Sequence, residues 1–162
     1  WGNALSDHAK SKSGEEADRL FAEAYTKYAE ALRIKPDFHK ALNNWAGSLL
    51  HHLAKKHSPE REAMLLEARE KLLTAERLCP GSGSYNLACV SARLGDISEA
   101  RRWLGNHLQS GQTLSQEEIA SDPDFEPIRT DPEFTRFLAT LPSESSVPRP
   151  PSPPGPDPDH RR

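Results

Sequence analysis

The sequence predicts an all-α fold in which antiparallel helix hairpins stack into a solenoid, with shorter helices covering its C-terminal end. Three observations lead to this prediction. The first half of the chain repeats itself at an interval of 44 residues. Within each repeat, small and large apolar residues recur at spacings of three and four, the period of an α-helix. After the repeats, prolines preceded by aspartate mark the starts of short helices.

The composition narrows the class of protein. The chain has 162 residues and a formal net charge of −3, so it lacks the basic excess of a nucleic-acid-binding protein. Its apolar runs are far shorter than the roughly 20 residues of a membrane span. Two cysteines, Cys79 and Cys89, favour a reducing compartment over a disulfide framework. We therefore expect a cytoplasmic chain that contacts neither nucleic acid nor membrane.

The repeat is visible without any gap in the alignment. A shift of 44 residues superimposes small, large apolar, charged and proline positions in one register. The aligned pairs are Trp1 with Trp45, Leu5 with Leu49, Glu23 with Glu67, Ala24 with Ala68, Lys27 with Lys71, Tyr28 with Leu72, Ala31 with Ala75, Arg33 with Arg77, Ile34 with Leu78 and Pro36 with Pro80. The chain begins inside this pattern and without an initiating Met, so further repeats are expected upstream.

The first unit, residues 1–36, is interpreted as two helices. The repeat register assigns Trp1, like Trp45 in the next unit, to core packing. Ser13 and Glu16 have the spacing of a capping box, which predicts the start of the second helix. This helix ends at Pro36, and its apolar stripe consists of Leu20, Ala24, Tyr28, Ala31 and Ile34.

The second unit, residues 37–80, has the same organisation. Asp37 is the expected N-cap of a helix whose stripe consists of Ala41, Leu42, Trp45, Leu49 and Leu53. Ser58-Pro59-Glu60 then combines an N-cap, a first-turn proline and an early acid, which predicts a second helix start. That helix stops before Pro80, and its stripe consists of Leu65, Ala68, Leu72, Ala75 and Leu78.

A third, degenerate unit covers residues 81–111, with Tyr85-Asn86-Leu87-Ala88 in its first helix and a turn at Leu94-Gly95-Asp96. Residues 112–141 are expected to form capping helices. Leu114-Ser115-x-x-Glu118-Ile119 has the pattern of a capping box with a hydrophobic staple, and Asp122-Pro123 and Asp131-Pro132 are further starts. The last helix should turn one apolar face inward, made by Phe134, Phe137, Leu138 and Leu141.

The remaining residues, 142–162, are dominated by proline and serine, with Val147 as the one apolar residue. Such a segment cannot bury enough surface to offset its ordering entropy, so we expect a disordered tail. Its overlapping P-x-x-P spacings also suit an SH3-like groove, although the plain tail is the preferred interpretation.

The repeats resemble the tetratricopeptide repeat family. Trp1-Gly2-x-x-Leu5 and Trp45-Ala46-x-x-Leu49 stand for the family's first-helix motif. The second-helix motif is matched by two sets, Ala24, Tyr28, Ala31 and Pro36, then Ala68, Leu72, Ala75 and Pro80. The family repeat has 34 residues, so the longer units predict helices extended at the hairpin turn. The Asp-Pro-x-Phe ending is similar to that of many bacterial members.

This resemblance implies a right-handed superhelix whose concave face, lined by the first helix of each unit, binds protein. In the family, asparagines on this face bind an extended peptide backbone, because an amide offers both a donor and an acceptor. The candidate peptide-binding residues are Asn3, Lys40, Asn43, Asn44, His51 and Asn86. The alternative is that Asn44 and Asn86 bridge adjacent helices structurally. Members that clamp a C-terminal carboxylate use cations where this chain has Ser82 and Asn86, so that ligand is not expected.

No catalytic, cofactor or metal constellation emerges from spacing. His51, His52 and His57 cluster, but no Cys, Asp or Glu stands at ligand spacing, so structural histidines are the preferred interpretation. Cys89 is expected to be a small buried side chain and not a nucleophile. The predicted function is a non-enzymatic protein–protein interaction module. The alternatives are a scaffold segment that self-associates through its N-terminal edge, and the sensor array of a larger signalling protein.

Overall fold

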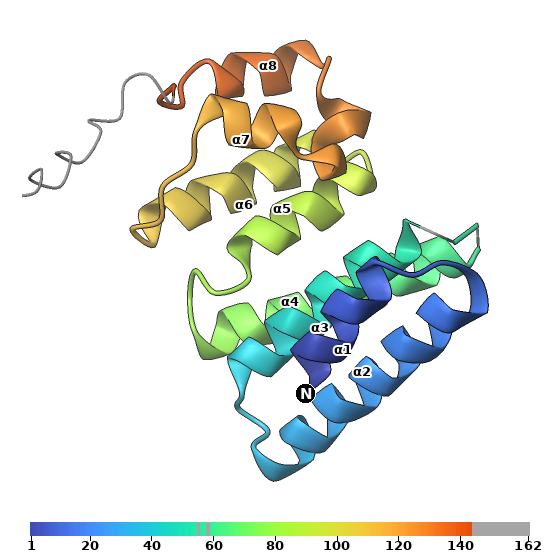
Figure 1. Ribbon diagram of the computed structural model, residues 1–162. Helices are drawn as coiled ribbons and strands as arrows, with labels where there is room; N and C mark the ends of the chain where they lie inside the picture. Colours follow the sequence, from blue (N-terminus) through green and yellow to red (C-terminus); the bar gives the residue numbers. More distant parts are fainter. Residues whose placement is uncertain (55, 58, 144–162) are drawn as a thin grey trace, which may run out of the picture.

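The computed structural model describes residues 1–54, 56, 57 and 59–143, and every regular element in them is a helix (Figure 1). The all-α class is therefore confirmed. The elements are α1 (Gly2–Lys10), α2 (Gly14–Ile34), α3 (His39–Leu53), α4 (Glu60–Leu78), α5 (Ser84–Arg93), α6 (Ile97–Gln109), α7 (Gln116–Ser121), the 3-10 helix η1 (Pro123–Ile128) and α8 (Pro132–Leu138).

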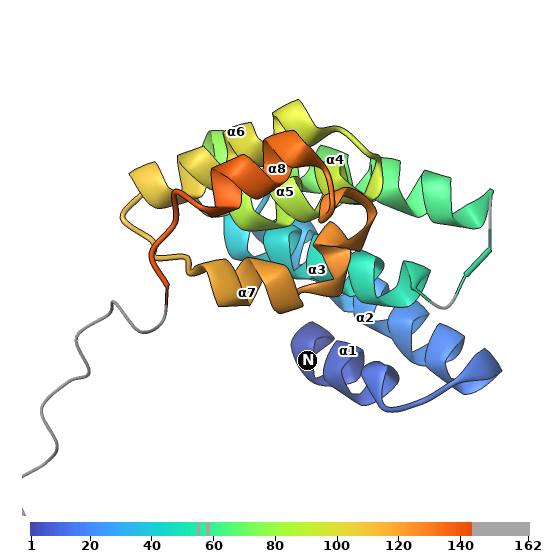
Figure 2. The ribbon, with the colours of Figure 1, turned by 90° about the horizontal axis from the view of Figure 1, so that it is seen from above.

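The first six helices pack in three successive pairs. The closest packing joins α1 to α2, α3 to α4 and α5 to α6. Each pair also contacts the next, because α2 packs against α3 and α4 against α5. The first helices of the pairs, α1, α3 and α5, touch one another in succession. The short elements α7, η1 and α8 gather beside α5 and α6, at the end of the molecule away from α2 (Figures 1 and 2).

The core is continuous from α3 to the C-terminal helices. One cluster of buried apolar residues extends from Ala46 to Leu141, and smaller clusters fill the first pair around Phe21 and Tyr28. Ala24 and Ala68, which share a register position, are both fully buried. Small side chains at these positions let neighbouring helices approach closely. The buried face expected of the last helix is present, with Phe134 fully buried and Phe137 partly so.

The core position expected for Trp1 is wrong. Its side chain is 95% exposed, whereas its register partner Trp45 is half-buried. The reason lies in the neighbouring helix. The rings of Tyr25 and Tyr28 on α2 stack against Trp45, and no helix among the described residues stands in the corresponding place beside Trp1.

The helix starts were predicted with mixed success. Ser115 and Glu118 form both bonds of a capping box, and Asp122 and Asp131 cap η1 and α8. Ser13 occupies the N-cap of α2, but its side chain makes no capping hydrogen bond. The Glu16 carboxylate pairs with Lys12, so the expected capping box is absent.

The cap of α3 was also misplaced. Phe38, not Asp37, holds the N-cap position, and no side chain there accepts a capping bond. Ser58, the expected N-cap, and the expected disordered tail from residue 144 onward lie outside the described residues. The helix after Ser58 begins at Glu60, with Pro59 at its N-cap position.

Candidate functional site

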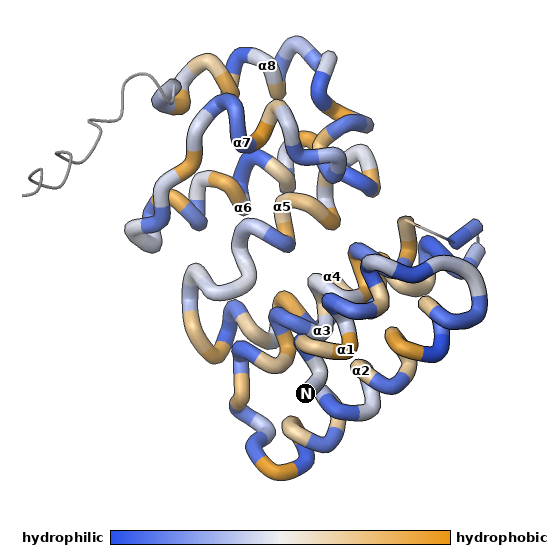
Figure 3. Tube along the Cα trace, viewed as in Figure 1, coloured by the Kyte–Doolittle hydropathy of each residue, from blue (hydrophilic) through white to orange (hydrophobic). Residues whose placement is uncertain are grey.

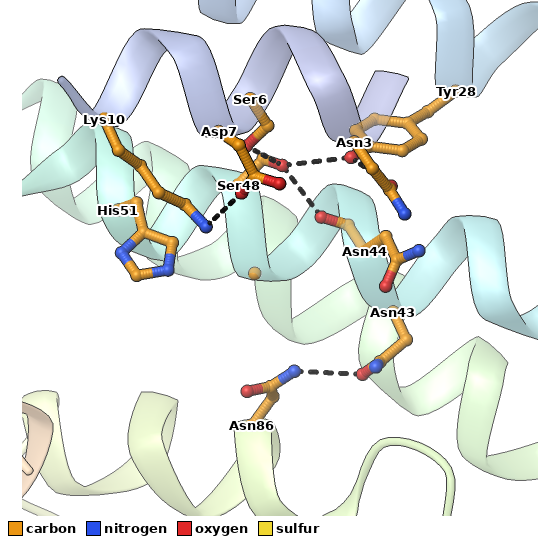
Figure 4. A pocket seen from close by; sticks show the side chains of 11 residues that line it. Asn3, Ser6, Asp7, Lys10, Tyr28, Asn43, Asn44, Ser48, His51 and Asn86 are labelled. Atoms are coloured by element: carbon orange, nitrogen blue, oxygen red, sulfur yellow. Dashed lines mark hydrogen bonds and ion pairs between the residues drawn. The ribbon is translucent and has the colours of Figure 1, made fainter. Parts of the chain in front are cut away.

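A polar groove lies between the first helices of the three pairs (Figure 4). It has a volume of about 290 Å³. α1 contributes one face with the spacing i, i+4, i+7, and α3 contributes residues three and four apart, as helix geometry requires for a shared face. The polar lining side chains are Asn3, Ser6, Asp7 and Lys10 from α1, Asn43, Asn44, Ser48 and His51 from α3, Tyr28 from α2 and Asn86 from α5.

Five of the six predicted peptide-binding residues line this groove, namely Asn3, Asn43, Asn44, His51 and Asn86. Lys40 does not. It is exposed on the same stripe of α3, about one turn before the asparagines, and stands outside the lining. The groove thus collects predicted residues from α1, α3 and α5, which are far apart in the sequence.

Sequence reasoning missed the other five polar lining residues, which are Ser6, Asp7, Lys10, Tyr28 and Ser48. Signals in the sequence point to two of them, Asp7 and Ser48. Asp7 falls on His51 in the 44-residue register, and it stands one helical turn after Asn3. Ser48 likewise follows Asn44 by four residues on α3. Periodicity along a single helix therefore suffices to find polar neighbours of a correctly chosen asparagine.

The floor of the groove is a hydrogen-bonded cluster of hydroxyls. Tyr28 donates its hydroxyl proton to Asn3 Oδ1 at 2.8 Å. Ser48 Oγ lies 2.7 Å from Ser6 Oγ and 2.9 Å from the carbonyl oxygen of Asn44. Burial raises the pKa of Tyr28, so its hydroxyl stays protonated and remains a donor. These bonds hold α1, α2 and α3 together beneath the groove.

The amides above this floor keep unused hydrogen-bonding capacity. Asn86 Nδ2 donates to Asn43 Oδ1 at 3.0 Å, which links α5 to α3 and supports in part the structural bridging considered for Asn86. Asn44 differs. Within the described part of the chain its side-chain amide makes no hydrogen bond, while Figure 4 shows it among the lining residues. Asn44 therefore offers a donor and an acceptor side by side to a ligand.

The groove carries no net charge at neutral pH. Asp7 and Lys10 form an ion pair of 2.8 Å, and the lysine hydrogen bond lowers the pKa of Asp7 below its usual value. The pKa of His51 is lowered as well, chiefly by burial and then by the Lys10 charge, so its imidazole is neutral near pH 7. A neutral, amide-rich surface suits an uncharged polar ligand better than a carboxylate or phosphate.

A second polar network joins α2 to α3 outside the groove. His52 stacks on Phe21 with ring centroids 4.4 Å apart, and its Nδ1 and Nε2 lie 2.9 Å from Tyr25 Oη and 2.8 Å from Asp18 Oδ1. This resembles a nucleophile–base–acid chain in connectivity. Burial, however, raises the pKa of Tyr25 far above its usual value, and Asp18 is also paired with Lys56. A nucleophile needs a lowered pKa, not a raised one. We therefore interpret this network as part of the packing between α2 and α3.

Within the described residues, one group brings three potential metal-ligand atoms close together. It consists of Cys89, Asp122 and Asp124. Their contacts argue against a metal. Asp122 accepts a hydrogen bond from Tyr85 at 2.6 Å, and Asp124 forms an ion pair with Arg93. Burial raises the pKa of the Cys89 thiol well above its usual value, whereas metal binding requires the thiolate. The cluster locks η1 onto α5, consistent with the buried, inert cysteine expected from sequence.

Comparison of the chain with family models, with curated proteins and with solved structures gives no match. Among the described residues, no helix combines the length and apolar character needed to cross a membrane.

Proposed function

We propose that this chain is a protein–protein interaction module whose polar groove binds an extended peptide segment of a partner. The observation that carries the proposal is the convergence of Asn3, Asn44 and Asn86 from α1, α3 and α5 on one groove. A peptide backbone presents a donor and an acceptor at every residue. Amide side chains on successive helices can satisfy these groups whatever the peptide sequence.

The proposed architecture is a right-handed superhelix of tetratricopeptide type. Its support is the packing order, in which the second helix of each pair contacts the first helix of the next and the first helices line one side in succession. A second support is the 44-residue register, whose alanines Ala24 and Ala68 are equally buried. In such an arrangement the concave side is the surface on which a ligand contacts several repeats at once.

The chemistry of the groove favours binding over catalysis, and a neutral segment over a C-terminal carboxylate. Its one cation, Lys10, is paired with Asp7, so a terminal carboxylate gains no uncompensated positive charge there. The groove hydroxyls of Ser6, Ser48 and Tyr28 bond to one another or to amides and backbone, not to a base. We propose the cytoplasm as its compartment, which agrees with Cys79 and Cys89 lacking a disulfide.

The proposal is tested by selecting peptides from a random display library against the wild-type chain and measuring their affinities by calorimetry. In the variant with Asn3, Asn44 and Asn86 all changed to alanine, we expect at least about tenfold weaker binding, since each lost bond to an uncharged group contributes ~1 kcal/mol. Asn106→Ala, on α6 and outside the groove, is the matched control and should bind like wild type.

Asn44→Asp keeps the size and the acceptor of the side chain, but it removes the donor and adds a negative charge to the groove. It should lose affinity while its helicity by circular dichroism stays that of wild type. If the triple variant binds the selected peptides as tightly as wild type does, the groove is not the binding surface. The scaffold interpretation would then be preferred.

A further inference from the structure

Gly47 leaves the part of α3 that lines the polar groove without a side chain. Hydrophilic and hydrophobic residues alternate along α3 (Figure 3), because one face of the helix packs in the core and the other lines the groove. A Cβ added to Gly47 would have Asn86 Nδ2 as its nearest neighbour outside α3, at 4.0 Å. An alanine would therefore fit, and it would favour the helix more than glycine does. Neither the backbone nor the packing of the chain requires a glycine at this position.

Two polar side chains flank Gly47 on the same face of α3. Asn44 precedes it by three residues and His51 follows it by four, which is the spacing of neighbours on a helix surface. Figure 4 shows the two side chains apart from each other along α3, with Asn86 facing α3 from α5. Within the described residues, neither the Asn44 amide nor the His51 imidazole makes a hydrogen bond. A neutral imidazole and an amide each offer both a donor and an acceptor to a ligand.

The spacing of these two side chains fits an extended peptide. Asn44 and His51 are seven residues apart, which corresponds to a rise of about 10 Å along the helix axis. Three residues of an extended chain span about the same length. A peptide that runs along α3 can therefore form hydrogen bonds with Asn44 and with His51, and it then passes over Gly47 between them. The missing side chain allows the peptide backbone to approach α3 closely at that point.

We propose that the bound peptide lies extended along α3, with its backbone against Gly47 and its hydrogen-bonding groups on Asn44 and His51. This path rests on the proposed function and adds to it the length of the recognised segment, an uncharged stretch of about three residues. The other possible occupant of the space beside Gly47 is a side chain of the ligand. The distance of 4.0 Å from the Cβ position to Asn86 Nδ2 favours the backbone, because a methyl group already fills that gap and a larger side chain does not fit.

The probe is the tightest-binding peptide from the display selection, synthesised with both ends capped and titrated by calorimetry with the 162-residue chain. Gly47→Ala should weaken its binding by about tenfold or more, because the methyl group takes the place of the peptide backbone. The same substitution should raise the melting temperature by roughly 2–4 °C, since alanine favours the helix. A loss of affinity together with a gain in stability is not explained by misfolding.

Gly105→Ala is the matched control. Gly105 lies inside α6, is half-buried like Gly47 and is outside the groove lining, and no described heavy atom lies within 4 Å of its added Cβ. This variant should gain a similar amount in melting temperature and bind the peptide like wild type.

Methylation of single backbone nitrogens of the peptide identifies the residue that contacts Gly47. At one position the N-methyl group should weaken binding to wild type by about tenfold, yet weaken binding to Gly47→Ala much less, because both changes act on the same contact. If truncating the peptide side chain at that position weakens binding while N-methylation does not, a ligand side chain occupies the space and the proposed path is overturned.

Equal affinity of wild type and Gly47→Ala for the peptide would also overturn the proposed path. If the variant with Asn3, Asn44 and Asn86 changed to alanine still loses binding in that case, the proposed function stands without it. If that triple variant binds like wild type, or if the selection gives no binding peptide, the proposed function fails and the path along α3 fails with it.

Discussion

Gly81 occupies the turn between α4 and α5, where the second helix pair joins the third. Its φ is 88°, a left-handed conformation that only glycine adopts easily. A Cβ added there would also lie 2.4 Å from Cβ of Ser110, at the end of α6. Any larger residue at position 81 would therefore destabilise the fold in two ways, through an unfavourable backbone conformation and through a steric clash with Ser110.

We expect Gly81→Ala to lower the free energy of unfolding by about 2 kcal/mol or more, of which ~1–2 kcal/mol comes from the backbone and the rest from crowding. Urea denaturation measures the loss. Gly111→Ala is the matched control, because its φ is 87° but no heavy atom lies within 4 Å of the added Cβ. It should show the backbone cost alone. Equal losses in the two variants would mean that Ser110 moves aside freely.

Individual site residues could be predicted from sequence where a motif within their own helix marks their position. Asn44 and Asn86 were found because each precedes the large apolar residue of its motif. The environment of Trp1 was not predictable, since it depends on a neighbour that the register of Trp1 does not encode. The hydrogen bond from Asn86 to Asn43 likewise spans 43 residues, and no local pattern specifies it.

At the scale of elements, Glu76 fixes the connection from α4 to α5. One carboxylate oxygen lies 2.7 Å from the Gly81 backbone nitrogen and 2.9 Å from Ser84 Oγ, and the other lies 2.9 Å from the Gly83 nitrogen. Ser84 is fully buried. The carboxylate thus accepts hydrogen bonds from three donors in the turn that follows α4. These charge-assisted bonds hold the turn in one conformation and so fix the orientation of α5 relative to α4.

Replacing Glu76 with alanine should destabilise the chain by about 2 kcal/mol, because hydrogen bonds to a charged group contribute ~1.5–3 kcal/mol and buried donors are left unpaired. Amide hydrogen exchange should show the loss first at Gly81 and Gly83. Glu70→Ala, an exposed glutamate on the same helix, should leave the stability within ~0.5 kcal/mol of wild type. Unchanged protection of the turn in Glu76→Ala would contradict the role assigned to the carboxylate.

The elements themselves were largely predictable because their signals are local. Stripes of apolar residues with a period near 3.6 predicted α2 and α4, and the residues from Ser115 to Ile119 contain the entire start of α7. The start of α3 was missed at Asp37 since a cap depends on the path of the incoming chain, which the sequence pattern does not describe. The two helices of a hairpin differ in length, since α2 and α4 have 21 and 19 residues whereas α1 and α3 have 9 and 15. The long helices are thus the second ones, and not both helices of each hairpin as predicted.

At the scale of the whole molecule, packing decides which histidines resist protonation. Burial lowers the pKa of His51 in the groove and of His107 on α6, although Glu76 and Glu118 partly oppose the shift at His107. The carboxyl groups with lowered pKa values, such as Asp18 beside Lys56, titrate in a more acidic range. A window just below pH 6.5 therefore reports on the two histidines.

In this window the unfolded chain binds more protons than the folded chain, because an unfolded histidine titrates near 6.5 and the folded ones lower. The stability contributed by their neutral forms is complete above pH 6.5 and is lost as the pH falls through the lowered pKa values. Urea denaturation should accordingly give a lower free energy of unfolding at about pH 5.5 than at about pH 7.5.

Changing both His51 and His107 to glutamine should make the free energy of unfolding less dependent on pH in this range. His39→Gln, which lies outside the groove lining, serves as the control. A slope that survives in the double variant would assign the acid sensitivity to other groups, and the desolvation of these two imidazoles would have no measurable effect on stability.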